Sequence, residues 1–355
     1  MMRQPALDAG SLGTLADGPR MALGLFDESR GGNRIVGHGG DTDFFHSHMQ
    51  LYPDARTGIF ISLNSSGRGA TDTLELRESL LHGFTDRYFP PRDATPPPAT
   101  TITTATETTT ATTSHAALAE GTYESARLPF STFLTTMTLF GQTKVTARQD
   151  GTVLIEPGPL SLHPAVYREI RPWVWQEVGG QRIVTMRVAD DQVQAIGFES
   201  AFTLLRTPPT RDAAIVLPVL AASVAVLLLG LLAWPVGAMI RRHHRLPAPG
   251  RPGRVARVLT RVAAAVALLA LAGWTAVVVT ISGLQEVPEP LLRALQGAQW
   301  VALLGVLPAA ARLVASVRYR EGVLGVLGSV CLLLALAGTA WFAEAFGLLS
   351  PDLSY

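Results

Sequence analysis

Four apolar runs fill most of the chain after residue 212, and they constrain its fold more than any other feature. The run at 213–240 carries no charged residue and is longer than the roughly 20 residues that cross the hydrocarbon of a bilayer. The third run is shorter and more polar than the others. The other three runs lie at 262–284, 292–311 and 322–349. The sequence therefore predicts a region of four transmembrane helices over 213–349, with the lipid bilayer as its partner.

The charges of the connecting loops predict the orientation of these helices. Arginines crowd the loops after the first and third runs, whereas the loop after the second run, 285–290, is acidic. Loops rich in Lys and Arg remain on the cytoplasmic side. The predicted location is therefore the bacterial inner (cytoplasmic) membrane, with several spans and with residues 1–212 on the extracytoplasmic side.

The first 20 residues lack the apolar stretch of a signal peptide. A long exported segment ordinarily follows such a peptide. We therefore expect that the chain begins inside a longer protein.

The overall charge and the rare residue types exclude some classes of function. The net charge of +1 argues against nucleic acid as a partner, because phosphate binding needs a dense basic surface. Cys331 is the single cysteine, so no intrachain disulfide can form. Lys144 is the single lysine, which limits any chemistry that depends on a lysine.

A segment rich in Pro and Thr divides the part of the chain before the membrane region. Residues 93–117 have little apolar surface to bury and are predicted to be an exposed linker. The linker separates one folded piece at 1–92 from another at 118–208.

The second piece, 118–208, has the pattern of a small antiparallel β-sheet or barrel domain. The pairs Asp150-Gly151 and Gly179-Gly180 stand between apolar runs and predict tight hairpin turns. Six or more short strands follow from this spacing. Trp173 and Trp175 alternate with a valine and are expected on one face, as core or rim residues.

The first piece, 1–92, predicts four antiparallel strands followed by a helix. The helix is expected at 72–89, with its leucines and Phe84 on one apolar stripe. One helix cannot cover both faces of a sheet, so this piece is expected to be part of a larger α+β domain. The four strands are expected at 21–29, 34–40, 44–53 and 57–65.

The sequence GHGG at 37–40, followed by FHS, by GIFISLNSSG and by DRYFP at 86–90, resembles the C-terminal portion of serine β-lactamase-related hydrolases. These are class C β-lactamases, penicillin-binding-protein-type peptidases and their esterase relatives. In this family a Lys-Thr-Gly or His-x-Gly triplet lies on the strand that lines the active site. His38-Gly39-Gly40 matches the second form. The resemblance implies that 1–92 is a fragment of a β-lactamase-like domain and that these three residues bind substrate.

Acyl transfer explains why such residues suit that strand. The reaction passes through an oxyanion that needs backbone N–H donors. An edge strand offers such donors, and glycine lets a carbonyl group approach closely. By the resemblance, His38 would contact a substrate carboxylate or assist proton transfer, and no metal or cofactor is required.

The nucleophile motif of that family, Ser-x-x-Lys, is absent. The residue three places before Lys144 is Gly141. Ser62-Leu63-Asn64 has the letters of the second family motif, Ser-x-Asn, but follows the triplet instead of preceding it, and we interpret it as a strand end. We therefore predict an N-terminally incomplete, membrane-anchored member of the family that is inactive as given. The complete form would hydrolyse amide or ester bonds of an acyl-type small molecule or peptide.

Three alternatives remain open at this stage. The first is a non-catalytic extracytoplasmic sensing or binding module on a membrane anchor. The second is a partner chain that supplies the serine and the lysine. The third is a metal site, because imidazole and carboxylate are good zinc ligands. Its candidate ligands are His38, Asp41, Asp43, His46 and His48.

Overall fold

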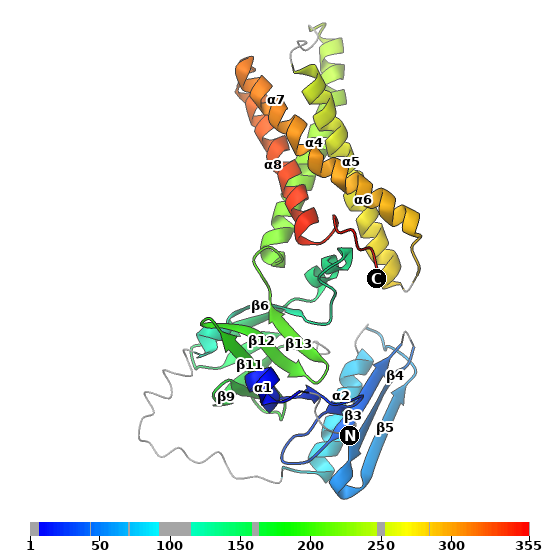
Figure 1. The fold of residues 1–355 in the computed structure, drawn as a ribbon, viewed down its shortest axis with the longest axis vertical. Coiled ribbons are helices and arrows are strands. Elements are labelled where there is room, and N and C mark those ends of the chain that lie inside the picture. Colours follow the sequence, from blue (N-terminus) through cyan, green and yellow to red (C-terminus); the bar gives the residue numbers. More distant parts are fainter. Residues whose placement is uncertain are drawn as a thin grey trace. The chain divides into compact units, whose positions relative to one another are not determined.

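The computed structural model describes residues 7–42, 44–69, 72–91, 115–157, 163–246, 253–283 and 285–354. The chain forms two compact units, drawn as ribbons in Figure 1. Unit 1 comprises Met1–Arg127 and Gly141–Thr207, and unit 2 comprises Leu128–Phe140 and Pro208–Tyr355. Most of the predicted linker, 93–117, lies outside the described residues.

The first part of unit 1 is a five-stranded antiparallel sheet with its strands in sequence order. Its strands are β1 (Arg20–Met21), β2 (Phe26–Asp27), β3 (Val36–Asp41), β4 (His46–Tyr52) and β5 (Thr57–Leu63). The short helices α1 (Ala9–Leu12) and η1 (Gly13–Asp17) precede it, and η2 (Pro53–Ala55) joins β4 to β5. The prediction of one strand at 21–29 is wrong. Gly24, with φ 82°, turns the chain there, so β1 and β2 are two short strands.

Helix α2 (Asp72–Tyr88) packs on one face of this sheet, but not through the predicted stripe. Leu76 and Leu80 are 49% and 46% exposed. The sheet face that α2 covers is polar, because His46, His48 and Gln50 of β4 point toward the helix and are buried. A polar sheet face selects a polar helix stripe, which an apolar pattern in the sequence cannot predict. That stripe consists of Thr73, Arg77, Leu81 and Thr85.

The second part of unit 1 is a closed antiparallel barrel, in the order β10-β11-β12-β13-β6-β7-β8-β9. The expected turns at 150–151 and 179–180 join β7 to β8 and β10 to β11, with Gly151 and Gly179 at positive φ. Trp175 is fully buried in the barrel core, and Trp173 packs against that core. The strands are β6 (Gly121–Ser125), β7 (Thr143–Ala147), β8 (Val153–Glu156), β9 (Ala165–Arg171), β10 (Val174–Glu177), β11 (Ile183–Ala189), β12 (Gln192–Glu199) and β13 (Phe202–Arg206).

Unit 2 contains the long apolar helices (Figure 1). The prediction of four is confirmed among the described residues: four helical segments are long and apolar enough to cross a membrane, which is consistent with a multi-pass membrane protein. The third segment, Glu289–Arg318, bends at Gly305 and is longer than predicted. The helices are α4 (Ala213–His243), α5 (Arg254–Ser282), α6 (Glu289–Leu304), α7 (Val306–Arg318) and α8 (Val323–Ala345). A short helix, η3 (Phe133–Phe140), from the β6–β7 connection also belongs to unit 2.

Two glycines of the β3 motif have different surroundings, which gives a matched test of the sheet. A Cβ at Gly37 would stand 2.5 Å from the Met49 carbonyl oxygen and 2.6 Å from Glu28 Oε2, whereas a Cβ at Gly40 would meet nothing within 4 Å. We expect Gly37→Ala to destabilise the sheet by about 2 kcal/mol, because the clash involves backbone. Gly40→Ala should leave stability unchanged. Hydrogen exchange of β4 amides in the full chain measures the difference, and equal exchange in both variants would contradict this packing.

Candidate functional site

The predicted site residues lie on both faces of β3. His38 and Gly40 point to the face away from α2, while Gly39 points toward α2, because side chains alternate along a strand. We call the first surface the open face; it consists of His38, Gly40, Ser47, Met49, Phe60 and Ser62, which neighbour one another across β3, β4 and β5. The structure thus separates His38 and Gly40 from Gly39 and does not bring all three to one surface.

The open face is accessible in the part of the chain that the structure describes. His38 is exposed and stacks on Phe26 with 4.6 Å between ring centroids. Phe60 is 67% exposed. The hydroxyls of Ser47 and Ser62 lie 2.8 Å apart and hydrogen-bond to each other. This surface offers an imidazole, two hydroxyls and bare backbone at Gly40 to a ligand.

Part of β3 is also an edge strand. Strand β2 pairs only with Val36 and Gly37, so no described strand borders the residues from His38 to Asp41 on that side. Alternate residues of this segment therefore present backbone N–H and C=O groups outward. Such N–H groups can bind a carbonyl oxygen or an anion.

The structure does not bring a lysine to this strand. Lys144 lies on β7 of the barrel, where it is exposed and pairs in register with Thr122 and Glu156. Ser62 lies near the end of β5, where its hydroxyl hydrogen-bonds to that of Ser47, and Asn64 directly follows the strand. No described arrangement therefore couples a serine to a lysine.

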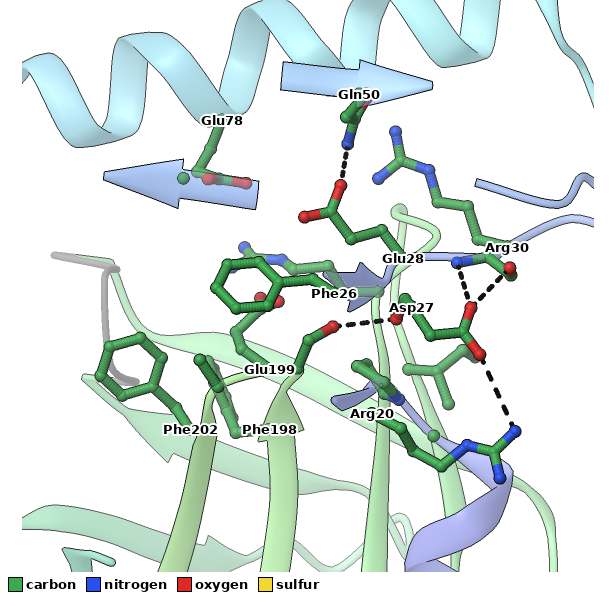
Figure 2. Close-up of a pocket in the computed structure, with 18 of the residues that line it drawn as sticks. Arg20, Phe26, Asp27, Glu28, Arg30, Gln50, Glu78, Phe198, Glu199 and Phe202 are labelled. Carbon is green, nitrogen blue, oxygen red and sulfur yellow. Dashed lines mark hydrogen bonds and ion pairs between the residues drawn. The ribbon is translucent and has the colours of Figure 1, made fainter. Parts of the chain in front are cut away.

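A cavity of about 340 Å³ lies on the other side of β3, within unit 1. Its walls come from α2, from the helix-covered face of β3 and β4, from the segment around β2, and from the β12–β13 turn (Figure 2). Gly39 and Phe26 belong to these walls, so the motif strand contributes to the cavity. The Ser200 hydroxyl donates to the Asp27 carbonyl oxygen at 2.8 Å and joins the barrel to the sheet there.

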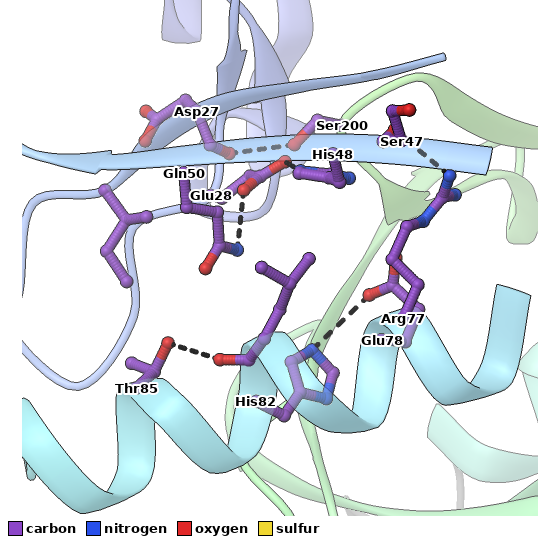
Figure 3. Close-up of polar contacts among 12 residues, drawn as sticks. Asp27, Glu28, Ser47, His48, Gln50, Arg77, Glu78, His82, Thr85 and Ser200 are labelled. Atoms are coloured by element: carbon purple, nitrogen blue, oxygen red, sulfur yellow. Dashed lines mark hydrogen bonds and ion pairs between the residues drawn. The ribbon is translucent and has the colours of Figure 1, made fainter. Parts of the chain in front are cut away.

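Glu28 organises the polar groups of the cavity wall (Figure 3). Its carboxylate binds His48 Nε2 at 2.8 Å and accepts a hydrogen bond from Gln50 Nε2 at 2.7 Å. Tyr52 donates to Gln50 Oε1 at 3.0 Å and lies 2.6 Å from the Thr85 hydroxyl of α2. The sheet is thus joined to α2 through a chain of hydrogen bonds, which holds the side chains of the wall in fixed positions.

Burial changes the protonation of three other groups that line the cavity. It raises the pKa of Glu199 to about 8, and the nearby Glu78 carboxylate adds to this effect. Burial likewise raises the pKa of Glu78. Burial, with the charges of nearby arginines, lowers the pKa of His82 to about 3. At neutral pH Glu199 is therefore largely protonated and His82 is neutral.

Several buried N–H groups around the cavity have no partner among the described residues. They are Arg20 Nε, Arg30 Nε and Arg77 Nε. Among the described residues Arg30 makes no ion pair, and its guanidinium donates one long hydrogen bond, of 3.5 Å, to the Leu81 carbonyl oxygen. The Glu199 carboxyl group makes no ion pair or side-chain hydrogen bond with a described residue, although its backbone pairs with Phe202. Donors without a partner, next to a protonated carboxyl group, can bind a small anionic ligand by donating hydrogen bonds to it.

The alternative of a metal site receives no support from the described residues. His46 binds Asp41 at 2.9 Å, His48 binds Glu28, and His38 lies on the opposite face. Asp43 lies outside the described residues. No group of three or more His, Cys, Asp or Glu side chains in the described part could hold a metal ion.

Sequence reasoning did not find the cavity. Its carboxylates and arginines come from segments far apart in the sequence: Glu28 and Glu78 are 50 residues apart, and Glu199 follows 121 residues after Glu78. The only local signal was the pair of histidines on alternate positions of β4.

Comparisons with known proteins identify no family. No family model matches the chain, and no curated protein matches it. An octameric penicillin-binding protein homologue from Pyrococcus abyssi is a distant structural neighbour, with 15% identity, a TM-score of 0.19, and coverage of 58% of this chain and 40% of that one.

Crystal structures of SurE and of SurE with D-Leu are further neighbours. The first has 17% identity, a TM-score of 0.27 and coverage of 58% of this chain and 41% of that one. The second has 16% identity, a TM-score of 0.25 and coverage of 53% and 38%. The chain thus spans about two fifths of the length of the solved structures it matches. Likenesses this weak carry no argument about fold or function.

The protonation of Glu199 gives a pH test of the cavity. Because the pKa of Glu199 is raised in the folded state from 4.5 to about 8, the folded chain holds a proton that the unfolded chain releases between these values. Glu199 therefore makes its full contribution to the free energy of unfolding below about pH 4.5, and this contribution is lost as the pH rises to about 8. We expect Glu199→Gln to be more stable than the wild type at pH 8, by up to about 4 kcal/mol, and equal to it near pH 4.5.

Thermal unfolding of the full chain in detergent between pH 4.5 and 8 measures this difference. Asp191→Asn, in an exposed turn of the barrel, is the matched control and should follow the wild type at every pH. A Glu199→Gln curve parallel to the wild-type curve would contradict the buried, protonated carboxyl.

Proposed function

We propose that this chain is part of a membrane-anchored serine β-lactamase-related hydrolase, and that its 355 residues contribute the substrate-binding strand of that enzyme. In this proposal β3 binds an acyl-type ligand, an amide or ester with a nearby carboxylate, but acyl transfer needs a nucleophile that these residues lack. The chain would be anchored in the bacterial inner membrane, with unit 1 on the extracytoplasmic side.

The observation that carries the proposal is the free edge of β3 beside the open face. Beyond the end of β2, backbone N–H groups of the segment from His38 to Asp41 are available to a ligand carbonyl oxygen. Gly40 leaves the approach clear, since a Cβ there would meet nothing within 4 Å. Donors fixed in a strand stabilise negative charge on oxygen without reorganising, which is what an acyl-transfer site needs.

His38 supplies the side chain expected next to those donors. It is exposed on the same face as Gly40, and the stacked Phe26 ring at 4.6 Å limits its rotation. A held imidazole can donate to a ligand carboxylate, and in its protonated form it adds charge to that hydrogen bond. The arrangement supports recognition of a ligand that carries both a carbonyl and a carboxylate.

The same residues do not supply the covalent step. A serine becomes nucleophilic when a base accepts its proton. The single lysine, Lys144, stands on an exposed barrel strand, and Gly141 occupies the place of the serine. Binding without turnover is therefore the activity we assign to this chain.

A fluorescent penicillin tests both parts of the proposal, because it carries an amide carbonyl and a carboxylate. We expect no covalent adduct on a denaturing gel, and the same with a fluorophosphonate. We expect reversible binding in fluorescence anisotropy, weakened roughly tenfold by His38→Ala, as loss of a charge-assisted hydrogen bond predicts. Lys144→Ala should bind like the wild type. A covalent adduct on a serine, or binding that ignores His38, would refute the proposal.

The cavity favours a second candidate function, that of an extracytoplasmic binding module for small carboxylates. Arg30 lines the cavity without an ion pair among the described residues, and its Nε donor is buried and unpartnered. Glu199, protonated at neutral pH, can donate to the other oxygen of a bound carboxylate. A cavity of about 340 Å³ is large enough for a small molecule.

Succinate titrated into the full chain by calorimetry tests this second function. We expect Arg30→Gln to weaken binding about tenfold, because a guanidinium–carboxylate contact is lost. Arg34→Gln is the matched control, since Arg34 is exposed and does not line the cavity. Absence of binding, or equal loss in both variants, would argue against this function.

A further inference from the structure

The connection between β6 and β7 leaves the barrel and packs with the apolar helices. Residues Leu128–Phe140 belong to unit 2, although the strands on both sides of them belong to unit 1. No charged residue occurs from 128 to 143, and half of this stretch forms the helix η3. We call Leu128–Phe140 the insert.

The insert shares one hydrophobic cluster with the ends of three long helices. Phe133 is fully buried and lies 5.0 Å from the Trp274 ring of α5. The cluster includes Val216 near the start of α4 and Phe342 near the end of α8. Where the chain leaves α8, Gly347 lies so close to the insert that a Cβ there would stand 2.7 Å from the Thr132 carbonyl oxygen. The insert is thus a packed part of unit 2.

The threonines of the insert satisfy their hydroxyls inside it. The Thr135 hydroxyl donates to the Thr132 carbonyl oxygen at 2.8 Å, Thr136 donates to Phe133 at 2.8 Å, and Thr138 donates to Thr135 at 2.8 Å. These threonines therefore expose little hydrogen-bonding capacity. Polar groups that are satisfied within their own segment suit a medium that is poor in water.

The outer surface of the insert is apolar and aromatic. Phe140 is 78% exposed, and Phe130 is partly exposed under the guanidinium of Arg211, with 5.1 Å from Arg211 Cζ to the ring centroid. Arg211 directly precedes α4. Aromatic rings and a long cationic side chain at the end of a candidate span are typical of the headgroup region of a bilayer.

We propose that the insert is a membrane-interface element, which inserts Phe140 and Phe130 into the headgroup region at one end of the helix bundle. The occupant of this surface is lipid, because the insert packs against the ends of α4, α5 and α8. At these ends α4 and α5 also expose apolar side chains, such as Leu217 and Val279. It lies at the end opposite the arginine-rich helix ends, Arg241 of α4 and Arg254 of α5. By the positive-inside rule this end faces the extracytoplasmic side.

A single fluorescent label tests the proposal in the full chain. Cys331 is the only cysteine, so Cys331→Ser gives a background for Phe140→Cys labelled with an environment-sensitive dye. Lys144→Cys, exposed and four residues beyond, is the matched control site. The protein is reconstituted in vesicles of phosphatidylcholine and phosphatidylglycerol, with a nitroxide quencher placed near the lipid headgroup.

We expect the label at 140 to emit at shorter wavelength than the label at 144 and to be quenched at least about twofold more strongly by the nitroxide lipid. Equal quenching at both sites would overturn the proposal, because the insert would not be distinguished from the barrel. A blue-shifted label at 140 that the nitroxide lipid does not quench would also overturn it, because the surface would then be covered by protein.

A second variant tests the packing of the insert without changing its sequence. Gly347→Ala places a Cβ against the Thr132 carbonyl oxygen at a residue with φ 67°, whereas Gly328→Ala, in α8, meets nothing within 4 Å. We expect Gly347→Ala to move the label at 140 toward its aqueous spectrum and Gly328→Ala to leave it unchanged. The nitroxide lipid could quench the label at 140 while neither substitution changes its spectrum. In that case the insert does not depend on the helix bundle, and its assignment to the helix ends is overturned.

Discussion

The position of α2 depends on one ion pair between that helix and the motif strand. Arg77 is 2% exposed, and its guanidinium donates to Asp41 Oδ1 at 2.8 Å and to the Ser47 carbonyl oxygen at 3.2 Å. Burial acts to raise the pKa of Asp41, but the hydrogen bonds from Arg77 and His46 outweigh it and hold the pKa below its ordinary value. A buried guanidinium without its carboxylate would cost several kcal/mol. Asp41 therefore determines the sheet face on which α2 packs. Because side chains alternate along a strand, His38 and Gly40 lie on the opposite face.

This division gives the two faces of β3 different chemistry. The helix-covered face is held by the contacts of Glu28 with His48 and Gln50, so its cavity has fixed walls and donors suited to a small anion. The open face has an exposed imidazole, two hydroxyls and a free strand edge. We propose acyl-type recognition at the open face and carboxylate binding in the cavity. His38 does not line the cavity and Arg30 does, so substitutions at these residues test different functions, although Phe26 stacks on His38 and also lines the cavity.

Patterns of near neighbours in the sequence predicted much of the fold. Turn glycines located the barrel hairpins, as the positive φ of Gly151 shows, and uninterrupted apolar runs located the long helices. Prediction failed where the partner of a residue is distant in sequence. The buried stripe of α2 could not be found, because Arg77 is buried only by virtue of Asp41, 36 residues earlier. Of the site, the sequence indicated the motif strand alone, since the cavity groups such as Glu199 come together only in the folded chain.

The position of the insert likewise could not be predicted from near neighbours in the sequence. The insert connects the two units. The sequence placed 128–140 within the predicted β domain, 118–208, and indicated no separate role for it. The structure assigns it to unit 2, so the chain crosses between the units at 127–128, at 140–141 and at 207–208. One crossing would leave unit 1 attached to the helices by a single segment. Each added crossing closes a loop of the chain, and each closure removes conformational freedom from the unfolded chain.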